Sequence, residues 1–135
     1  MRVFLDTNVL LSAFYSHGTC TELYDHCLDA HVLFTSEFVL EEFREKAVRK
    51  LKFSPERVVK ALHNIQMYSI MVSEATLPHP ICKDKDDDHI VAAAVKAEVA
   101  CIVTGDKEFQ ELKSTMGIPI VAPSDFWKFS GHHAS

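Results

Sequence analysis

Acidic residues from four distant parts of the sequence lie close to the ends of predicted strands. Asp6 and Asp106 each end a short strand-like run, and Glu41 and Glu42 lie in the first turns of a predicted helix. Four more crowd the start of another predicted helix: Asp84, Asp86, Asp87 and Asp88. Because the carboxyl ends of parallel strands gather at one edge of an open sheet, these segments can meet there. Several ionised carboxylates share one edge only if cations neutralise them.

The donor atoms decide which cation such a site would take. Carboxylate oxygens select hard divalent ions, Mg²⁺ or Mn²⁺, over zinc. His79 and His89 lie near the acidic residues, but the sequence has no H-x-x-x-H pair that would favour a zinc site. Hard ions lower the pKa of a water, align it for in-line attack on a phosphate and stabilise the departing oxygen. The acidic residues therefore predict metal-dependent phosphate chemistry.

Each acidic residue also has a purely structural interpretation. Asp6 and Asp106 can cap the helices that follow them. Glu41 and Glu42 can lie on a solvated helix face, and Asp84 and Asp86 fit a solvated helix start better than a ligand role. Convergence of separate segments on one edge favours the metal site over these separate explanations.

The elements that must position these residues alternate between strands and helices. We expect strands over 3–5, 32–35, 67–72, 100–104 and 118–121. We expect a helix through Tyr15 that Thr7 or Asn8 caps, further helices over 20–30, 37–50, 55–66, 86–97 and 107–112, and a terminal turn over 124–129. This order predicts an α/β protein: a three-layer α/β/α sandwich with a central, mostly parallel five-stranded sheet.

Length and composition fit one compact domain. The chain has 135 residues, of which 47% are hydrophobic and 24% charged, so we expect a single domain over 1–130 and a frayed tail over 131–135. No apolar run approaches the roughly 18 residues of a membrane span, and Asp6 interrupts the first apolar stretch where a signal peptide needs an uncharged one. The four cysteines form no C-x-x-C pair. We therefore expect a soluble, cytoplasmic protein with reduced thiols.

Four segments, in order and spacing, resemble the PIN-domain ribonucleases: 3–10 (VFLDTNVL), 40–43 (LEEF), 86–94 (DDDHIVAAA) and 103–109 (VTGDKEF). The resemblance extends from Val3 to about Phe126 and is greatest to the toxins of prokaryotic toxin–antitoxin pairs. It implies an endoribonuclease that hydrolyses RNA phosphodiester bonds with Mg²⁺ or Mn²⁺ as cofactor. It also implies an antitoxin protein as partner and a homodimer or higher oligomer.

The resemblance assigns roles to individual residues. It makes Asp6, Glu42, Asp88 and Asp106 the catalytic, metal-binding quartet. It makes Asn8 and Thr104 the polar neighbours that orient this quartet, with Asp87 in reserve.

Two of these assignments involve a choice between adjacent residues. A helical wheel places Glu41 and Glu42 on opposite flanks of the apolar stripe, equally far from its centre, so periodicity leaves both open. By resemblance we prefer Glu42, because the family glutamate precedes a bulky apolar residue, here Phe43. By the same reasoning we prefer Asp88 to Asp87, because the family aspartate lies just ahead of the Ile-Val-Ala-Ala run.

The charge distribution indicates where RNA would bind. The formal net charge is −5, yet residues 44–60 hold seven of the fourteen Lys and Arg. An acidic site repels a polyanion, so a nuclease needs a separate cationic surface to hold its substrate. We expect RNA contacts from this segment: Arg44, Lys46, Arg49, Lys50 and Lys52. The alternatives are ordinary solvated charges or a surface for an acidic antitoxin segment.

Three other functions are compatible with parts of the pattern. A haloacid-dehalogenase-like phosphatase also begins with a strand and an Asp, but it needs a second acid two residues later, where this chain has Asn8. A receiver-like switch needs an Asp at the end of the third strand, where this chain has Ser73 and Glu74. A non-catalytic PIN-like module that binds RNA or protein is the remaining alternative, disfavoured by the complete acidic set.

Overall fold

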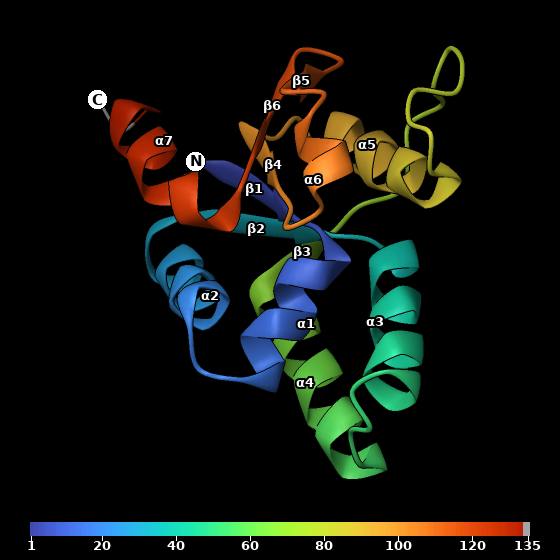
Figure 1. Cartoon of the computed structure of the whole chain (residues 1–135), viewed down its shortest axis with the longest axis vertical. Helices are drawn as coiled ribbons and strands as arrows, with labels where there is room; N and C mark the ends of the chain where they lie inside the picture. The colour runs from blue at the N-terminus through green and yellow to red at the C-terminus, as the bar shows by residue number, and fades with distance from the viewer. Residues whose placement is uncertain (134–135) are drawn as a thin grey trace.

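A six-stranded sheet lies between two layers of helices in the computed structural model, which describes residues 1–133 (Figure 1). The strand order is β3-β2-β1-β4-β6-β5. Every neighbouring pair is parallel except β5 with β6, which is antiparallel. The predicted α/β class and mostly parallel sheet are confirmed, with six strands instead of five.

The elements follow the predicted alternation closely. The strands are β1 (Arg2–Leu5), β2 (Val32–Thr35), β3 (Ser69–Met71), β4 (Cys101–Val103), β5 (Ser114–Thr115) and β6 (Ile118–Val121). The helices are α1 (Thr7–Tyr15), α2 (Thr19–Ala30), α3 (Glu37–Arg49), α4 (Pro55–Tyr68), α5 (Lys85–Ala97), α6 (Lys107–Gln110) and α7 (Phe126–His133), with a 3-10 turn, η1 (Pro123–Asp125), before α7.

The connections decide which face each helix covers. From β1 through β2 to β3 the chain moves one way across the sheet, by way of α1–α2 and then α3–α4. It then returns past β1 to β4 by way of α5. Because parallel crossovers are right-handed, the reversal places α5 on the face opposite to α1–α4, as Figure 1 shows.

The central strands are buried on both faces. Val3, Phe4 and Leu5 of β1 are at most 2% exposed, and the three residues of β4 are completely buried. Strands covered on both sides need no apolar–polar alternation, which explains their uniformly apolar runs. All four cysteines are free, as expected for reduced thiols. No helix within residues 1–133 combines the length and the apolar character needed to cross a bilayer.

The structure differs from the sequence prediction at three places. α4 continues to Tyr68, so the strand predicted over 67–72 is confined to Ser69–Met71. The two-residue β5 was not predicted and pairs with β6 across a tight turn. α7 continues through His133, so 131–133 are helical where a frayed tail was expected. The rest of that predicted tail, 134–135, lies outside the described residues.

Candidate active site

The candidate site lies where the strand order reverses, between β1 and β4. In an open α/β sheet this switch point leaves a crevice at the carboxyl ends of the strands. Asp6 follows β1 and Asp106 begins α6 shortly after β4, and each caps the helix that it precedes. The structure therefore confirms the capping role for both residues. Asp106 caps α6 with Oδ1, which accepts a hydrogen bond from the Glu108 amide, so its other carboxylate oxygen takes no part in the cap.

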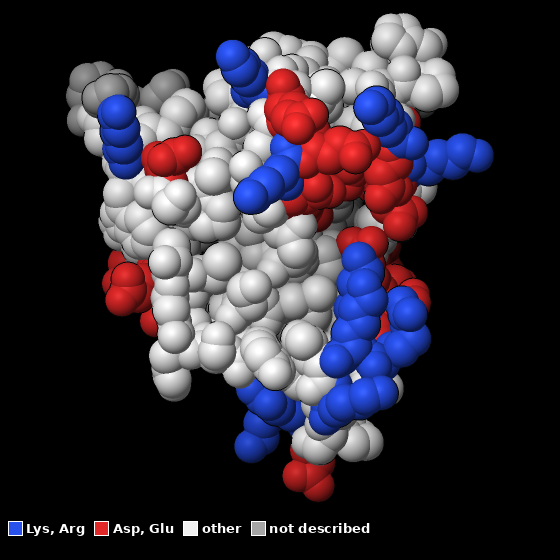
Figure 2. All heavy atoms as spheres, viewed as in Figure 1, with Lys and Arg blue, Asp and Glu red and all other residues white. Residues whose placement is uncertain are grey.

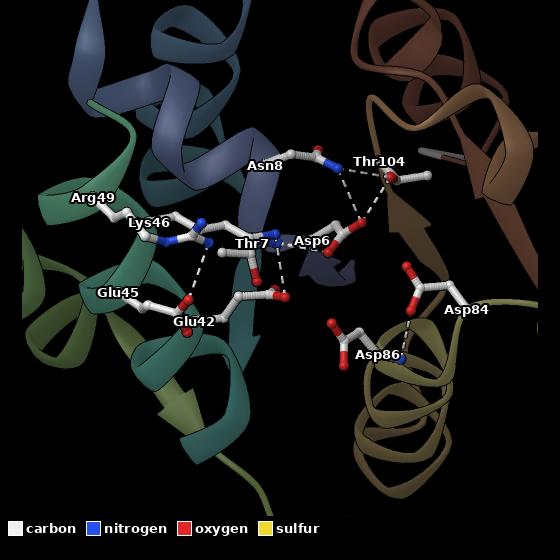
Figure 3. Close-up of polar contacts among 10 residues, drawn as sticks. All are labelled: Asp6, Thr7, Asn8, Glu42, Glu45, Lys46, Arg49, Asp84, Asp86 and Thr104. Atoms are coloured by element: carbon white, nitrogen blue, oxygen red, sulfur yellow. Dashed lines mark hydrogen bonds and ion pairs between the residues drawn. The ribbon is translucent and has the colours of Figure 1, made fainter.

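Asp6 is held by hydrogen bonds on both carboxylate oxygens. Oδ1 accepts from the Thr7 amide at 2.7 Å, and Oδ2 accepts from the Thr104 hydroxyl at 2.8 Å and from Asn8 Nδ2 at 3.2 Å (Figure 3). The residue is only 5% exposed. The pKa of Asp6 is raised to about 6: burial is the largest cause and the nearby Glu42 contributes, while the bonds from Thr104 and Thr7 and the charge of Lys46 oppose the rise.

Asn8 and Thr104 connect the end of β1 to the loop after β4. The Thr104 hydroxyl, besides donating to Asp6, accepts from the Asp106 amide at 3.1 Å and from Asn8 Nδ2 at 3.3 Å. Asn8 Oδ1 accepts from the Gly105 amide at 3.0 Å. The structure therefore places both predicted neighbours against Asp6, in a network that fixes its orientation.

Beside this network lies a small cavity, here called the acidic pocket, with a volume of about 80 Å³. Figure 2 shows the acidic side chains gathered on the surface in this region, with basic side chains over α3 beside them. Six carboxylates, one amide and one ammonium group line the pocket: Asp6, Glu42, Asp84, Asp86, Asp87, Asp106, Asn8 and Lys46. The four predicted segments thus converge on one place.

Asp87, and not Asp88, faces the acidic pocket. The Asp88 carboxylate turns to the preceding loop, where its Oδ1 accepts from the amides of Cys82 at 2.7 Å and Ile81 at 3.2 Å. The pKa of Asp87 is raised to about 7, mainly by burial and also by the charges of Asp6, Asp84, Asp106 and Glu42. The structure thus brings the reserve residue to the other acids and gives Asp88 a loop-holding position.

Glu42, and not Glu41, lines the acidic pocket. Its side chain is 12% exposed and pairs with Lys46, whose Nζ lies 3.3 Å from Glu42 Oε2 (Figure 3). Glu41 is exposed and lines only the neighbouring hollow between α3 and the first turn of α5. Of the two residues that the helical wheel left open, Glu42 is therefore the one beside the other acidic side chains.

Three residues line the acidic pocket that the sequence did not predict there. Asp84 and Asp86 are exposed, as a solvated helix start should be, yet both line the acidic pocket. Asp84 also caps α5 by accepting from the Asp86 amide at 2.9 Å. The signal for Asp84 was its i, i+3 spacing to Asp87, which places both on one side of the first turn. Lys46, expected on the RNA-binding surface, is the residue that no sequence pattern placed inside the pocket.

The acidic pocket suits a hard cation in its donor chemistry. Six carboxylates and one ammonium group, that of Lys46, line it, and the charges of neighbouring carboxylates contribute to the raised pKa of Asp6 and of Asp87. Oxygen donors are those that Mg²⁺ and Mn²⁺ prefer. Within residues 1–133, however, no three His, Cys, Asp or Glu side chains already form a metal-holding group. In this arrangement the carboxylate of Glu42 pairs with Lys46 instead.

The predicted RNA-contacting residues divide into two groups. Lys46 pairs with Glu42, and Arg49 Nη2 lies 3.1 Å from Glu45 Oε1 in an exposed ion pair. Arg44, Lys50 and Lys52 are exposed. Four of the five residues are therefore exposed to a polyanion, and Lys46 is partly exposed beside the acidic pocket.

Comparisons with known proteins identify the family and the fold of the chain. The PIN domain family model matches residues 2–108. A chain in the crystal structure of VapBC2 from Rickettsia felis, bound to a DNA fragment from their promoter, has a similar fold at a TM-score of 0.66, covering 90% of this chain and 98% of that chain. Its sequence identity is 14%, so this likeness concerns the fold alone. None of the curated proteins matches the sequence. Since the family model covers well over half of the residues, the chain belongs to the PIN-domain family.

Proposed function

We propose that the protein is a metal-dependent endoribonuclease that uses Mg²⁺ or Mn²⁺ bound by Asp6, Glu42, Asp87 and Asp106. PIN-domain proteins are generally nucleases, which supports hydrolysis of a phosphodiester bond. The observation that carries the proposal is the convergence of these four carboxylates on the acidic pocket, where burial and mutual repulsion raise the pKa of Asp6 and Asp87. Asp87 takes the place that the sequence resemblance gave to Asp88.

The protein's own groups have distinct parts in this reaction. Asn8 and Thr104 hold Asp6 in one orientation, so that its charge is directed at the pocket without reorganisation. Asp84 and Asp86 add negative charge at the rim. A bound divalent cation would supply an activated water and stabilise charge that develops on the phosphate. Lys46 stands at the pocket wall, where its ammonium group can contact a phosphate oxygen once Glu42 is engaged elsewhere.

We further propose that the protein is the toxin of a toxin–antitoxin pair and forms a homodimer or higher oligomer. The solved structure from R. felis supports this, because its fold matches over 90% of the chain and it is a VapBC2 complex bound to promoter DNA. Light scattering of the purified protein tests the oligomer. Inhibition of its ribonuclease activity by a purified antitoxin encoded beside it tests the pairing.

The rival functions have less support. Position 8, where a phosphatase of the haloacid-dehalogenase type needs an acid, is an asparagine that donates to Asp6. A PIN-like module without catalysis would have no need of mutually repelling carboxylates in one pocket.

A cleavage assay with a fluorescent single-stranded RNA tests the proposal. We expect cleavage with Mn²⁺ or Mg²⁺, none with EDTA, and none by Asp6→Asn or Asp106→Asn, because Asn keeps the side-chain volume but removes a negative ligand. Glu111→Gln, an exposed acid outside the acidic pocket, is the matched control and should cleave normally. Cleavage by Asp6→Asn at the wild-type rate, or undiminished activity in EDTA, would refute the metal site.

A further inference from the structure

Three hollows adjoin the acidic pocket, and they differ in charge. The first lies between α3 and the first turn of α5 and has four carboxylates and one guanidinium: Glu41, Glu42, Glu45, Asp86 and Arg44, together with Phe38. The second lies between the loop before α5 and α6, and its charged residues are Asp87, Glu108, Glu111 and Lys83. The third, here called the α1/α3 groove, has no carboxylate: Asn8, Leu11, Ser12, Tyr15, Lys46, Lys50 and Leu51 line it.

The α1/α3 groove is continuous with the acidic pocket. Asn8 and Lys46 line both, so one end of the groove opens beside Asp6 and Glu42. The groove has a volume of about 200 Å³ and is lined mainly by apolar surface between its two lysines and its hydroxyls. A nucleic-acid strand that enters or leaves the acidic pocket through this groove meets two lysines. In either of the other hollows it would meet at least three carboxylates. Because a polyanion is repelled by carboxylates and attracted by lysines, charge selects the α1/α3 groove.

Helix periodicity explains how the groove is built. Asn8, Ser12 and Tyr15 follow one another at i, i+4 and i+7 along one side of α1, and Lys46 and Lys50 lie at i and i+4 on α3. α1 and α3 pack directly against each other. The two rows of side chains therefore run together from the acidic pocket toward the C-terminal ends of both helices, where Figure 2 shows basic side chains.

Tyr15 supplies an aromatic surface at the far end of the groove. It is 54% exposed, and its ring is nearly parallel to that of Phe53, with centroids 6.3 Å apart and 13° between the planes. Arg57 fixes this arrangement, because its guanidinium lies 3.9 Å from the Phe53 ring centroid and donates to the carbonyls of Phe14 and Tyr15. An exposed aromatic ring held in place beside a cationic groove is the combination that binds single-stranded nucleic acid.

We propose that single-stranded RNA extends from the acidic pocket along the α1/α3 groove, with its phosphates beside Lys46 and Lys50 and one base stacked on Tyr15. This inference rests on the proposed ribonuclease function, since it concerns the path of that substrate. Tyr15 is then a binding residue that acts on any base, and the groove contributes affinity without fixing the cleaved sequence.

Binding measurements in the Asp6→Asn background, with a fluorescent single-stranded RNA, test this path without cleavage. We expect Tyr15→Ala to weaken binding by about 5- to 100-fold, the range for loss of one stacked base, and Tyr15→Phe to bind normally. Lys50→Gln should reduce the slope of log affinity against log salt by about 0.7, the value for one lost phosphate contact. Tyr68→Ala and Lys96→Gln are the matched controls: Tyr68 is 52% exposed on α4, and Lys96 lies in the last turn of α5. Both should bind like the parent.

The outcomes separate the two proposals. If the wild-type protein cleaves RNA but Tyr15→Ala and Lys50→Gln bind it as the parent does, the groove is not the RNA path and the ribonuclease function stands. If the wild-type protein neither binds nor cleaves RNA, both proposals fail together. If the two variants lose affinity for poly-glutamate and keep their affinity for RNA, the groove belongs to an acidic protein partner instead. Photocrosslinking of a 5-iodouridine RNA to Tyr15 is the expected positive result, and thermal melting checks that the Ala variant is folded.

Discussion

The carboxylates of Asp87 and Asp88 are adjacent in sequence and do different work: Asp87 lines the acidic pocket, and Asp88 accepts hydrogen bonds from the amides of Ile81 and Cys82. Successive side chains of a helix point about 100° apart, so the two residues can be substituted one at a time to separate an effect on cleavage from an effect on stability. The amides that Asp88 holds belong to the loop between β3 and α5, which borders the pocket.

We expect Asp87→Asn to abolish Mn²⁺-dependent cleavage without destabilising the fold. Asp88→Asn should instead lower the free energy of unfolding by about 1 to 3 kcal/mol, because a charged acceptor of backbone amides is lost, and leave cleavage within a few fold. Denaturant unfolding and the RNA cleavage assay measure the two effects. Loss of cleavage in Asp88→Asn at unchanged stability would return the ligand role to Asp88.

The fold was predictable because its signals are local and mutually consistent. The apolar runs 3–5 in β1 and 101–103 in β4 indicate strands buried on both faces, and the alternation with helices predicts parallel crossovers. β5 escaped prediction because it has two residues and a turn, Met116–Gly117, in which both residues have positive φ. Tight hairpin turns of this kind usually carry Asn-Gly or Asp-Gly, and this chain has a methionine at the first position.

The candidate site was predictable as a set of segments and less so as a set of atoms. Strand ends located Asp6 and Asp106, since topology alone brings the ends of β1 and β4 together. Which of Asp87 and Asp88 faces the pocket depends on where the backbone amides of Ile81 and Cys82 lie. These residues belong to a loop without sequence periodicity, so the positions of their amides could not be predicted. The position of Lys46 depended likewise on its pairing with Glu42.

The two adjacent glutamates of α3 should differ sharply in their effect on cleavage. Glu42→Gln should lower the rate by about 10- to 100-fold or more, because it removes a charge from the acidic pocket. Glu41→Gln is the matched control, one residue away and exposed, and should stay within a few fold. Small, equal effects would mean that Asp6, Asp87 and Asp106 hold the metal without a glutamate.

The ammonium group of Lys46 should compete with the metal ion for the carboxylates of the acidic pocket. Lys46→Gln removes the ammonium group that pairs with Glu42 and opposes the raised pKa of Asp6. A partly exposed pair of this kind is worth about 1 kcal/mol, so we expect Mn²⁺ to bind about fivefold more tightly and the metal-free protein to melt at a lower temperature. Titration calorimetry with MnCl₂ measures the affinity.

Arg49→Gln is the control for Lys46→Gln, because Arg49 forms the same i, i+4 type of pair with Glu45 on the same helix. The side chains of that pair are 61% and 65% exposed, and neither lines the acidic pocket. Its loss should leave Mn²⁺ affinity unchanged. Weaker Mn²⁺ binding by Lys46→Gln than by the wild type would show that Lys46 holds the carboxylates in place for the ion instead of competing with it.

The metal-free protein should lose stability as the pH rises from about 4 to about 7. In the folded protein, burial is the largest cause that raises the pKa of Asp6 from 3.8 to about 6 and that of Asp87 from 3.8 to about 7. Between these values the folded state holds protons that the unfolded chain has released, so raising the pH favours unfolding. For the buried Asp6 the shift corresponds to roughly 2 to 3 kcal/mol.

Denaturant unfolding across this pH range, in EDTA and in Mn²⁺, measures the dependence. The Asp6→Asn variant should show a shallower decline than the wild type, because its amide does not ionise and the repulsion on Asp87 is reduced. Saturating Mn²⁺ should remove most of the decline in the wild type, since an ion that binds only the folded state stabilises it most where the carboxylates are ionised. A stability that instead rises with pH between 4 and 7 in EDTA would mean that the carboxylates of the acidic pocket are held in their charged form without a metal.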